Sequence, residues 1–223
     1  MPPFAASSLT LQDVHQQFGL QRGYVDSYSD LLTLEPLTEY EQQDVLQTRE
    51  DWNDHLATGS VSEGQVKLLS IGPLLRLARF YHRPLRIWAE EGITQIQISD
   101  GEQVITGRLD ILAVHSEQLT PDSSPFWVLV IESKGSAISP SAGLPQLLTY
   151  AYSRLQQQQK VWGLVSNGEY YRFVQIQAGA MSQYALLPSL NLTDVHSAQQ
   201  IVQVLKAIRQ AQVDALPVLS VAG

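Results

Sequence analysis

Three short motifs in the middle of the sequence place charged or hydrogen-bonding side chains at regular spacings. Asp110 follows Gly107-Arg108-Leu109 within a segment rich in Ile, Leu and Val, and Glu132-Ser133-Lys134 ends an apolar run. Gln146 and Tyr150 are four residues apart, which places them on one face of a helix. Together the motifs supply two carboxylates, an ammonium group, an amide and a phenol.

The charged side chains of these motifs suit a metal-dependent hydrolysis. Side chains two positions apart on a strand point to the same face, so Glu132 and Lys134 project together. Asp110 stands among apolar residues, where a carboxylate needs a partner or a metal. If the two strands pair, Asp110 and Glu132 converge, and two carboxylates plus a backbone carbonyl form a site for Mg²⁺ or Mn²⁺. A lysine beside that metal could position or help deprotonate the water that attacks a phosphodiester.

Each motif taken alone also has a purely structural interpretation. Glu132 and Lys134 could form an ion pair, with Asp110 capping a turn, since spaced charge pairs are common and usually structural. Gln146 and Tyr150 could be ordinary polar residues of a helix surface. The single motifs therefore do not separate a catalytic site from a set of structural contacts.

The order of the three motifs along the chain is more specific than any one of them. A Gly-x-x-Asp strand, a Glu-x-Lys strand and a Gln-x-x-x-Tyr helix, in that order, resemble the PD-(D/E)xK nuclease superfamily. More narrowly, residues 61–177 resemble RecB-type nucleases and the N-terminal nuclease domains of type I restriction-enzyme R subunits. The resemblance implies the restriction-endonuclease-like fold, an α/β core in which helices flank a central mixed sheet.

The resemblance also implies a role for each motif residue. Asp110 and Glu132 would bind the divalent metal, Mg²⁺ or Mn²⁺. Lys134 would be the catalytic lysine. The helix that carries Gln146 and Tyr150 would supply auxiliary catalytic residues that support the site.

Two positions depart from the family pattern or have a second explanation. Leu109 stands where the family name places a proline before the aspartate. Glu63 matches the acidic residue that family members often carry on the helix before the sheet, which makes it a further candidate catalytic residue. Ser60 and Glu63 also have the spacing of a capping box, in which Glu63 would only stabilise the start of a helix.

The pattern of hydrophobic residues predicts the elements that carry these motifs. Apolar residues at helical spacing predict helices over residues 38–56, 60–83, 145–158 and 194–212, with a kink or break at Gly72-Pro73. Runs rich in Ile, Val and aromatic residues predict strands over 85–91, 93–99, 104–114, 126–133, 161–166 and 170–176. Residues 126–131 are apolar at odd and even positions alike, so both faces of this strand would be apolar, which is typical of a central strand covered on both faces. This order of elements predicts an α/β body around a mixed sheet.

Charge divides the chain into two parts. The 223 residues carry 14 Lys and Arg against 22 Asp and Glu, a net charge of −8 with a pI near 5.0. Residues 1–60 hold ten of the acids and two of the bases, so the remainder is neutral. We therefore expect an acidic helical N-terminal extension over 1–60, a nuclease-like domain over 61–212 and a loose C-terminal tail over 213–223.

Composition and absent motifs exclude several other classes of protein. The chain has no cysteine, which excludes disulfides, thiolate metal sites and a cysteine nucleophile. Its five histidines show no zinc-binding spacing, and it contains neither a Gly-rich nucleotide loop nor a Gly-x-Ser-x-Gly elbow. No apolar run approaches the length of about 20 residues that a membrane helix needs, and the N-terminus shows no secretory signal. A cytoplasmic location is expected.

A basic segment near residue 80 is the candidate nucleic-acid contact. Arg76, Arg79 and Arg83 would share one helix face at i, i+3 and i+7, and Arg86 follows closely. Such a stripe could contact phosphates, which would make these four arginines nucleic-acid-binding residues. Arginines near the C-terminus of a helix are also favoured by the helix dipole alone, and that alternative stays open.

The function expected from these observations is metal-dependent hydrolysis of DNA, as in restriction–modification. The expected partners are DNA, Mg²⁺ or Mn²⁺, and either a second copy of the chain or a subunit that supplies specificity. A first alternative is an accessory module that keeps the fold but has little or no turnover. A second is an unrelated α/β interaction protein whose charges are structural. The acidic extension could also cover the DNA-binding face, in which case deleting residues 1–58 would tighten DNA binding.

Overall fold

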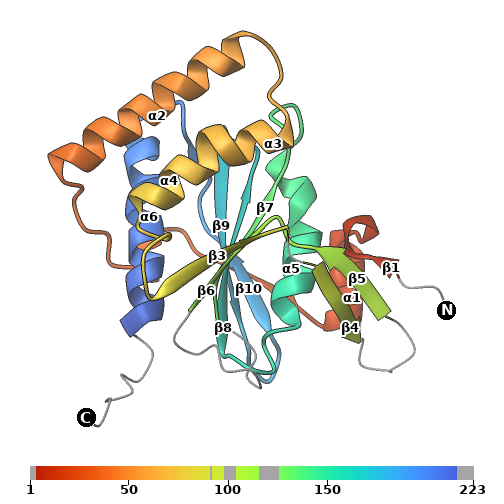
Figure 1. Ribbon diagram of the computed structural model, residues 1–223. Helices are drawn as coiled ribbons and strands as arrows, with labels where there is room; N and C mark the ends of the chain where they lie inside the picture. Colours follow the sequence, from red (N-terminus) through yellow and green to blue (C-terminus); the bar gives the residue numbers. More distant parts are fainter. Residues whose placement is uncertain (1–3, 91, 98–103, 116–125, 215–223) are drawn as a thin grey trace.

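An eight-stranded mixed sheet forms the centre of the protein (Figure 1). The structure is a computed structural model, and it describes residues 4–90, 92–97, 104–115 and 126–214. The strands of this sheet are β2 (Gln21–Tyr24), β3 (Leu85–Ala89), β6 (Ile111–His115), β7 (Trp127–Ser133), β8 (Lys160–Ser166), β9 (Tyr170–Gln177), β10 (Gln183–Leu186) and β11 (Leu190–Asn191). They run in the order β2-β10-β9-β8-β7-β6-β3, and β11 pairs with β9.

Strand β7 lies inside this sheet and carries Glu132 and Ser133. It pairs antiparallel with β6 and parallel with β8, and all seven of its residues are buried. Its side chains enter two different cores, with Leu129 and Ile131 on one face and Val130 on the other. The expectation of a central strand covered on both faces is confirmed.

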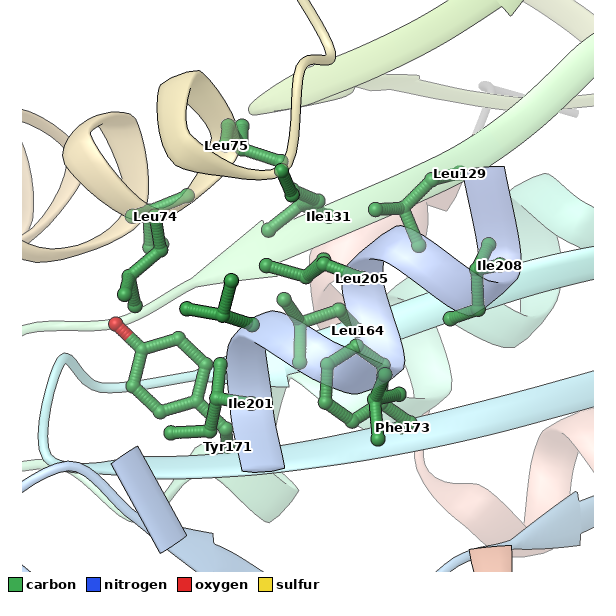
Figure 2. Packing of buried hydrophobic residues seen from close by; sticks show 14 of the residues in the cluster. Leu74, Leu75, Leu129, Ile131, Leu164, Tyr171, Phe173, Ile201, Leu205 and Ile208 are labelled. Atoms are coloured by element: carbon green, nitrogen blue, oxygen red, sulfur yellow. The ribbon is translucent and has the colours of Figure 1, made fainter. Parts of the chain in front are cut away.

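Helices cover both faces of the sheet. On one face, α6 (Val195–Asp214), α4 (Gly72–Leu77) and α2 (Glu39–Ala57) enclose the larger core. Figure 2 shows this core, in which Leu75 of α4 and Leu205 of α6 lie near Ile131 of β7. On the other face, α5 (Leu144–Tyr152) and α1 (Leu11–Phe18) pack over a second core. The predicted mixed sheet flanked by helices is therefore present.

The strand expected over residues 104–114 is two strands in two different sheets. β5 (Val104–Arg108) joins β1 (Phe4–Ala5) and β4 (Gly92–Gln97) in a three-stranded sheet, whereas β6 begins at Ile111. Leu109 at the break is fully buried in the second core, and Asp110 follows it outside both strands. The break allows the Asp110 side chain to turn toward the end of β7.

The N-cap of the helix expected from residue 60 lies two residues later than predicted. The N-cap of α3 (Glu63–Val66) is Ser62, whose side chain forms a capping box with Gln65. The proposed box of Ser60 with Glu63 is therefore wrong. Glu63 has no capping role, and its carboxylate is available for other contacts.

A wide π-helical turn connects α3 to α4. It spans Lys67–Ile71, and the Gly72 N–H donates to the Lys67 carbonyl five residues back. Pro73 has no N–H to donate, and its ring would clash with the carbonyl of the preceding turn in a regular helix. The wider turn before Pro73 takes the place of the predicted kink or break.

Residues 1–60 contribute strands as well as the expected helices. β2 extends the eight-stranded sheet by pairing parallel with β10, and β1 pairs parallel with β5. α2 begins at the predicted capping box of Thr38 and Glu41, and it buries Trp52 in the larger core. Of the expected C-terminal tail, residues 215–223 lie outside the described residues. Within the described residues, no helix is both long and apolar enough to cross a bilayer.

Candidate active site at the ends of β6 and β7

Asp110 lies against the last residues of β7. Because β6 and β7 are antiparallel, the residue that precedes β6 meets the end of β7. The Asp110 Oδ2 atom accepts hydrogen bonds from the Ser133 N–H at 2.7 Å and from the Ser133 hydroxyl at 2.9 Å. These two bonds fix the carboxylate and leave Oδ1 for the other side chains of the site. The structure therefore brings Asp110 to the Glu132-Ser133-Lys134 motif.

The Glu132 carboxyl group is buried, and only one of its oxygens is satisfied. Glu132 is 2% exposed, and its Oε1 accepts a hydrogen bond from the Lys134 Nζ at 2.5 Å. Among the described residues, no group hydrogen-bonds the buried Oε2. Burial and the negative charge of Asp110 raise the pKa of Glu132 to about 7, although Lys134 acts in the opposite direction. A buried carboxylate oxygen beside a second carboxylate is a favourable place for a cation.

Lys67 is part of the site and was not anticipated from the sequence. Its Nζ lies 2.8 Å from Asp110 Oδ1, 3.1 Å from Glu63 Oε1 and 4.0 Å from Glu90 Oε1. Burial lowers the pKa of Lys67, but its hydrogen bonds and charge interactions with Asp110 and Glu63 outweigh burial, so the pKa is raised. The signal in the sequence was the i, i+4 spacing of Glu63 and Lys67, which alone indicates only a pair on a helix surface.

Two further acids stand at the rim of the site. The side chain of Glu63, the predicted helix acid, is 42% exposed and contacts Lys67. Glu90 was not predicted: its N–H donates to the Asp110 carbonyl at 2.9 Å, and its carboxylate pairs with Arg108 at 2.8 Å. The backbone of Glu90 is left-handed, with φ at 55°. Non-glycine residues with positive φ are uncommon and cluster at functional sites.

Gln146 and Tyr150 contact the turn that carries Asp110. Both lie on α5 and both donate to the Arg108 carbonyl, at 3.4 Å from the Gln146 Nε2 and 3.2 Å from the Tyr150 hydroxyl. Gln146 also donates to the Tyr150 oxygen at 3.1 Å. Burial raises the pKa of the Tyr150 phenol to about 12, so the phenol stays a neutral donor well into the basic range. A Cβ at Gly107 would lie 2.1 Å from the Tyr150 oxygen, so glycine is needed there.

The arginines expected to contact nucleic acid do not share one helix face. α4 ends before Arg79, whose backbone is left-handed at φ 64°, so Arg79 and Arg83 lie outside the helix. Arg76 is paired with Asp44 of the acidic helix α2. Arg79, Arg83 and Arg86 are exposed. The predicted stripe is therefore wrong in its geometry, because the left-handed turn at Arg79 ends the helix that would have carried it.

The side chains of the site fit a divalent cation that takes few ligands from the protein. Asp110 and Glu132 supply the carboxylate oxygens. No group of three or more Asp, Glu, His or Cys side chains in the described part of the chain is arranged to hold a metal. Mg²⁺ is commonly bound by one or two carboxylates together with waters and substrate phosphates. A pair of carboxylates, one of them with a buried oxygen that has no hydrogen bond among the described residues, would therefore suit magnesium better than a metal that needs an all-protein cage.

Comparisons with known proteins show a weak structural similarity. No family model and no curated protein matches the chain. Among solved structures, the chain is similar to a fragment described as an HsdR subunit of a type I restriction enzyme from Vibrio vulnificus YJ016, with 17% sequence identity and a TM-score of 0.38. The match covers 64% of this chain and 25% of that structure, so this chain spans about a quarter of its length. A similarity at this level does not establish a family.

Proposed function

We propose that the protein is a metal-dependent nuclease that hydrolyses phosphodiester bonds in DNA. One observation carries the proposal: Asp110 is bonded to Ser133, the residue between Glu132 and Lys134, and a buried Glu132 oxygen has no hydrogen bond among the described residues. The order of the three motifs along the chain and the mixed α/β sheet support the same function.

Each side chain of the site has its own role in this proposal. Asp110 and Glu132 would hold Mg²⁺, which would polarise the scissile phosphate and lower the pKa of a bound water. Ser133 holds one Asp110 oxygen, so that the other faces the cation. Lys134 keeps its ammonium group beside Glu132, where it orients the attacking water and offsets negative charge on the phosphate. Gln146 positions the turn before Asp110 through the Arg108 carbonyl.

Cleavage assays on single substitutions test the proposed function. We expect Asp110→Ala and Lys134→Ala to lower the cleavage rate by about 100-fold or more, because each removes a group needed to activate water or hold the metal. The substrates are double-stranded, single-stranded and branched DNA, each with Mg²⁺ and with EDTA. Lys160→Ala is the matched control, since Lys160 begins β8 at the end remote from Ser166, the residue paired with Ser133.

Folded Asp110→Ala or Lys134→Ala protein that cleaves DNA as fast as the parent would contradict the proposed function. Folding is checked by thermal melting of each variant. Loss of cleavage in the Lys160→Ala control as well would show that the assay reports general damage to the protein.

A second candidate is a binding module that keeps this site without useful turnover. One feature favours it: Asp110 and Glu132 already have ammonium partners, Lys67 at 2.8 Å and Lys134 at 2.5 Å. The two lysines therefore partly neutralise the charges of Asp110 and Glu132 without a metal. Calorimetric titration with Mn²⁺ beside the cleavage assay separates the candidates, because metal binding without cleavage of any DNA form favours the module.

A further inference from the structure

The Lys67 ammonium group contacts the Asp110 oxygen that the proposed metal would need. Ser133 engages Asp110 Oδ2, so Oδ1 is the oxygen that faces the cation, and Oδ1 accepts the Lys67 ammonium at 2.8 Å. Two cations at contact distance from one carboxylate oxygen repel each other strongly. Binding of a metal ion at Asp110 therefore requires the ammonium group to move.

The two rim glutamates offer the ammonium group a second position. Its Nζ already lies 3.1 Å from Glu63 and 4.0 Å from Glu90, and the lysine stem has several rotatable bonds. The side chains of these glutamates are 42% and 53% exposed, against 13% for Asp110. Exposed ion pairs are weaker than partly buried ones, so the ammonium prefers Asp110 while no metal is bound.

With a divalent ion bound, the net charge of the site is opposite to that of one phosphodiester only if Lys67 stays nearby. The cluster has four carboxylates and three cationic groups, a balance of one negative charge when all are ionised. Its members are Glu63, Glu90, Asp110 and Glu132 with Lys67, Lys134 and Arg108. A divalent ion changes this balance to one positive charge, which is the complement of a single phosphodiester. Without Lys67 the balance would be zero, so this complementarity favours a lysine that stays near Glu63 and Glu90.

Two unusual backbone features position this lysine and its second acceptor. Lys67 begins the π-helical turn between α3 and α4, and such turns are frequent at functional sites. Glu90 has a left-handed backbone whose N–H is bonded to the Asp110 carbonyl. The left-handed backbone of Glu90 costs conformational energy, and the Glu90 carboxylate lies 4.0 Å from the Lys67 ammonium group.

We propose that Lys67 is a movable cation that competes with the divalent ion for Asp110. It binds Asp110 in the metal-free protein and passes to Glu63 and Glu90 when the ion binds. This inference rests on the proposed function. It makes Lys67 a positioning residue that sets the metal affinity of the site.

Calorimetric titration of the full chain with Mn²⁺ tests the competition. Lys67→Met removes the charge but keeps most of the stem, and Lys67→Arg keeps the charge. We expect Lys67→Met to bind Mn²⁺ about tenfold more tightly than the parent, the scale of one charge-assisted contact. Lys67→Arg is expected to bind no more tightly than the parent. Lys160→Met is the control for loss of a lysine elsewhere.

Thermal melting gives a second result that a merely structural lysine would not produce. In EDTA, Lys67→Met should melt below the parent, because Asp110 and Glu63 lose their counter-ion. Saturating Mn²⁺ should raise the melting temperature of Lys67→Met more than that of the parent, since tighter binding to the folded state stabilises it more. A structural lysine would leave the same deficit with and without Mn²⁺.

The outcomes distinguish this inference from the proposed function. Parent protein that binds Mn²⁺, with equal or weaker binding by Lys67→Met, overturns the movable cation and leaves the proposed function standing. If neither the parent nor Lys67→Met binds Mn²⁺, both the inference and the metal-dependent function are overturned.

Discussion

At the scale of single residues, Glu132 makes the site sensitive to pH near neutrality. Burial and the charge of Asp110 raise the pKa of its carboxyl group from 4.5 to about 7. Folding therefore favours the protonated form of this group. Its contribution to stability is fully present below about pH 4.5 and is lost as the pH rises through about 7.

Glu132→Gln tests this assignment, because it keeps the shape of the side chain and removes its ionisation. In EDTA, we expect the parent to lose stability relative to Glu132→Gln as the pH rises from about 4.5 to about 7. The total change is on the order of 3 kcal/mol, since one pKa unit corresponds to about 1.4 kcal/mol. Melting curves of both proteins across this pH range measure it.

Glu169→Gln is the control for this pH experiment, because Glu169 is a partly buried acid in the turn between β8 and β9. At each pH, the difference in melting temperature between Glu132→Gln and the parent is compared with the difference between Glu169→Gln and the parent. Parallel curves for Glu132→Gln and the parent would contradict the raised pKa of Glu132.

The sequence predicted part of the site at this scale. Asp110, Glu132 and Lys134 meet as expected, because strand periodicity and an antiparallel pair suffice to bring them together. Lys67 and Glu90 were missed. Their positions depend on a π-helical turn and a left-handed backbone, which tertiary packing imposes and which no local propensity indicates.

At the scale of elements, α5 holds the junction of β5 and β6 in place. The Tyr150 hydroxyl passes over Gly107 and donates to the Arg108 carbonyl, directly before the turn at Asp110. The helix therefore acts on the turn before Asp110 through the Arg108 carbonyl. Tyr150 is buried in the second core, and through this hydrogen bond it can still support the candidate site around Asp110 at the edge of that core.

Gly107→Ala should disrupt this junction. The new Cβ would lie 2.1 Å from the Tyr150 oxygen, and overpacking of this kind typically costs about 1–3 kcal/mol. Tyr150→Phe removes the hydroxyl without a clash and should cost about 1 kcal/mol for the lost hydrogen bond. Denaturant unfolding of both variants measures these free energies.

Gly64→Ala is the matched glycine control, because a Cβ there meets nothing within 4 Å and the residue lies in α3. It should stabilise the protein by about 0.5–1 kcal/mol, since alanine is the better helix former. Equal stabilities of Gly107→Ala and Gly64→Ala would rule out the close contact with Tyr150.

Element boundaries were harder to predict than elements. Ser60 with Glu63 and Ser62 with Gln65 are equally good capping boxes by sequence, and a contact distant in the chain decides between them. Ser136 exchanges hydrogen bonds with the Val61 backbone, at 2.8 and 2.9 Å, which holds that residue outside the helix. The break at Leu109 was missed because Val104-Ile105 before it and Ile111-Leu112 after it both favour a strand, so the whole segment resembles one strand.

At the scale of the whole molecule, the acidic N-terminal segment is part of the folded body. β2 lies in the main sheet, and Trp52 of α2 is fully buried. Lys206 of α6 pairs with Glu41 of α2 at 2.6 Å. Deleting residues 1–58 would remove the strands β1 and β2 and a core tryptophan. The truncation expected from the charge distribution to tighten DNA binding would therefore unfold the protein.

A single charge can test whether the acidic helix α2 restrains DNA binding. Asp44 of α2 is paired with Arg76, so Asp44→Asn releases this arginine for a phosphate. We expect Asp44→Asn to bind DNA several-fold more tightly at low salt, and the slope of log affinity against log salt to steepen by about one unit. Fluorescence anisotropy in EDTA measures binding without cleavage.

Asp54→Asn separates release of Arg76 from the change in net charge. Asp54 is an exposed acid on the same helix, so both variants alter the total charge equally. If α2 only repels DNA at long range, the two substitutions should have equal effects, because such repulsion depends on the total charge of the helix and not on which acid is neutralised. A larger effect of Asp44→Asn would instead place the DNA against α4 beside Arg76. Equal effects would remove Arg76 from the DNA-binding surface and leave the exposed Arg79, Arg83 and Arg86 as its candidates.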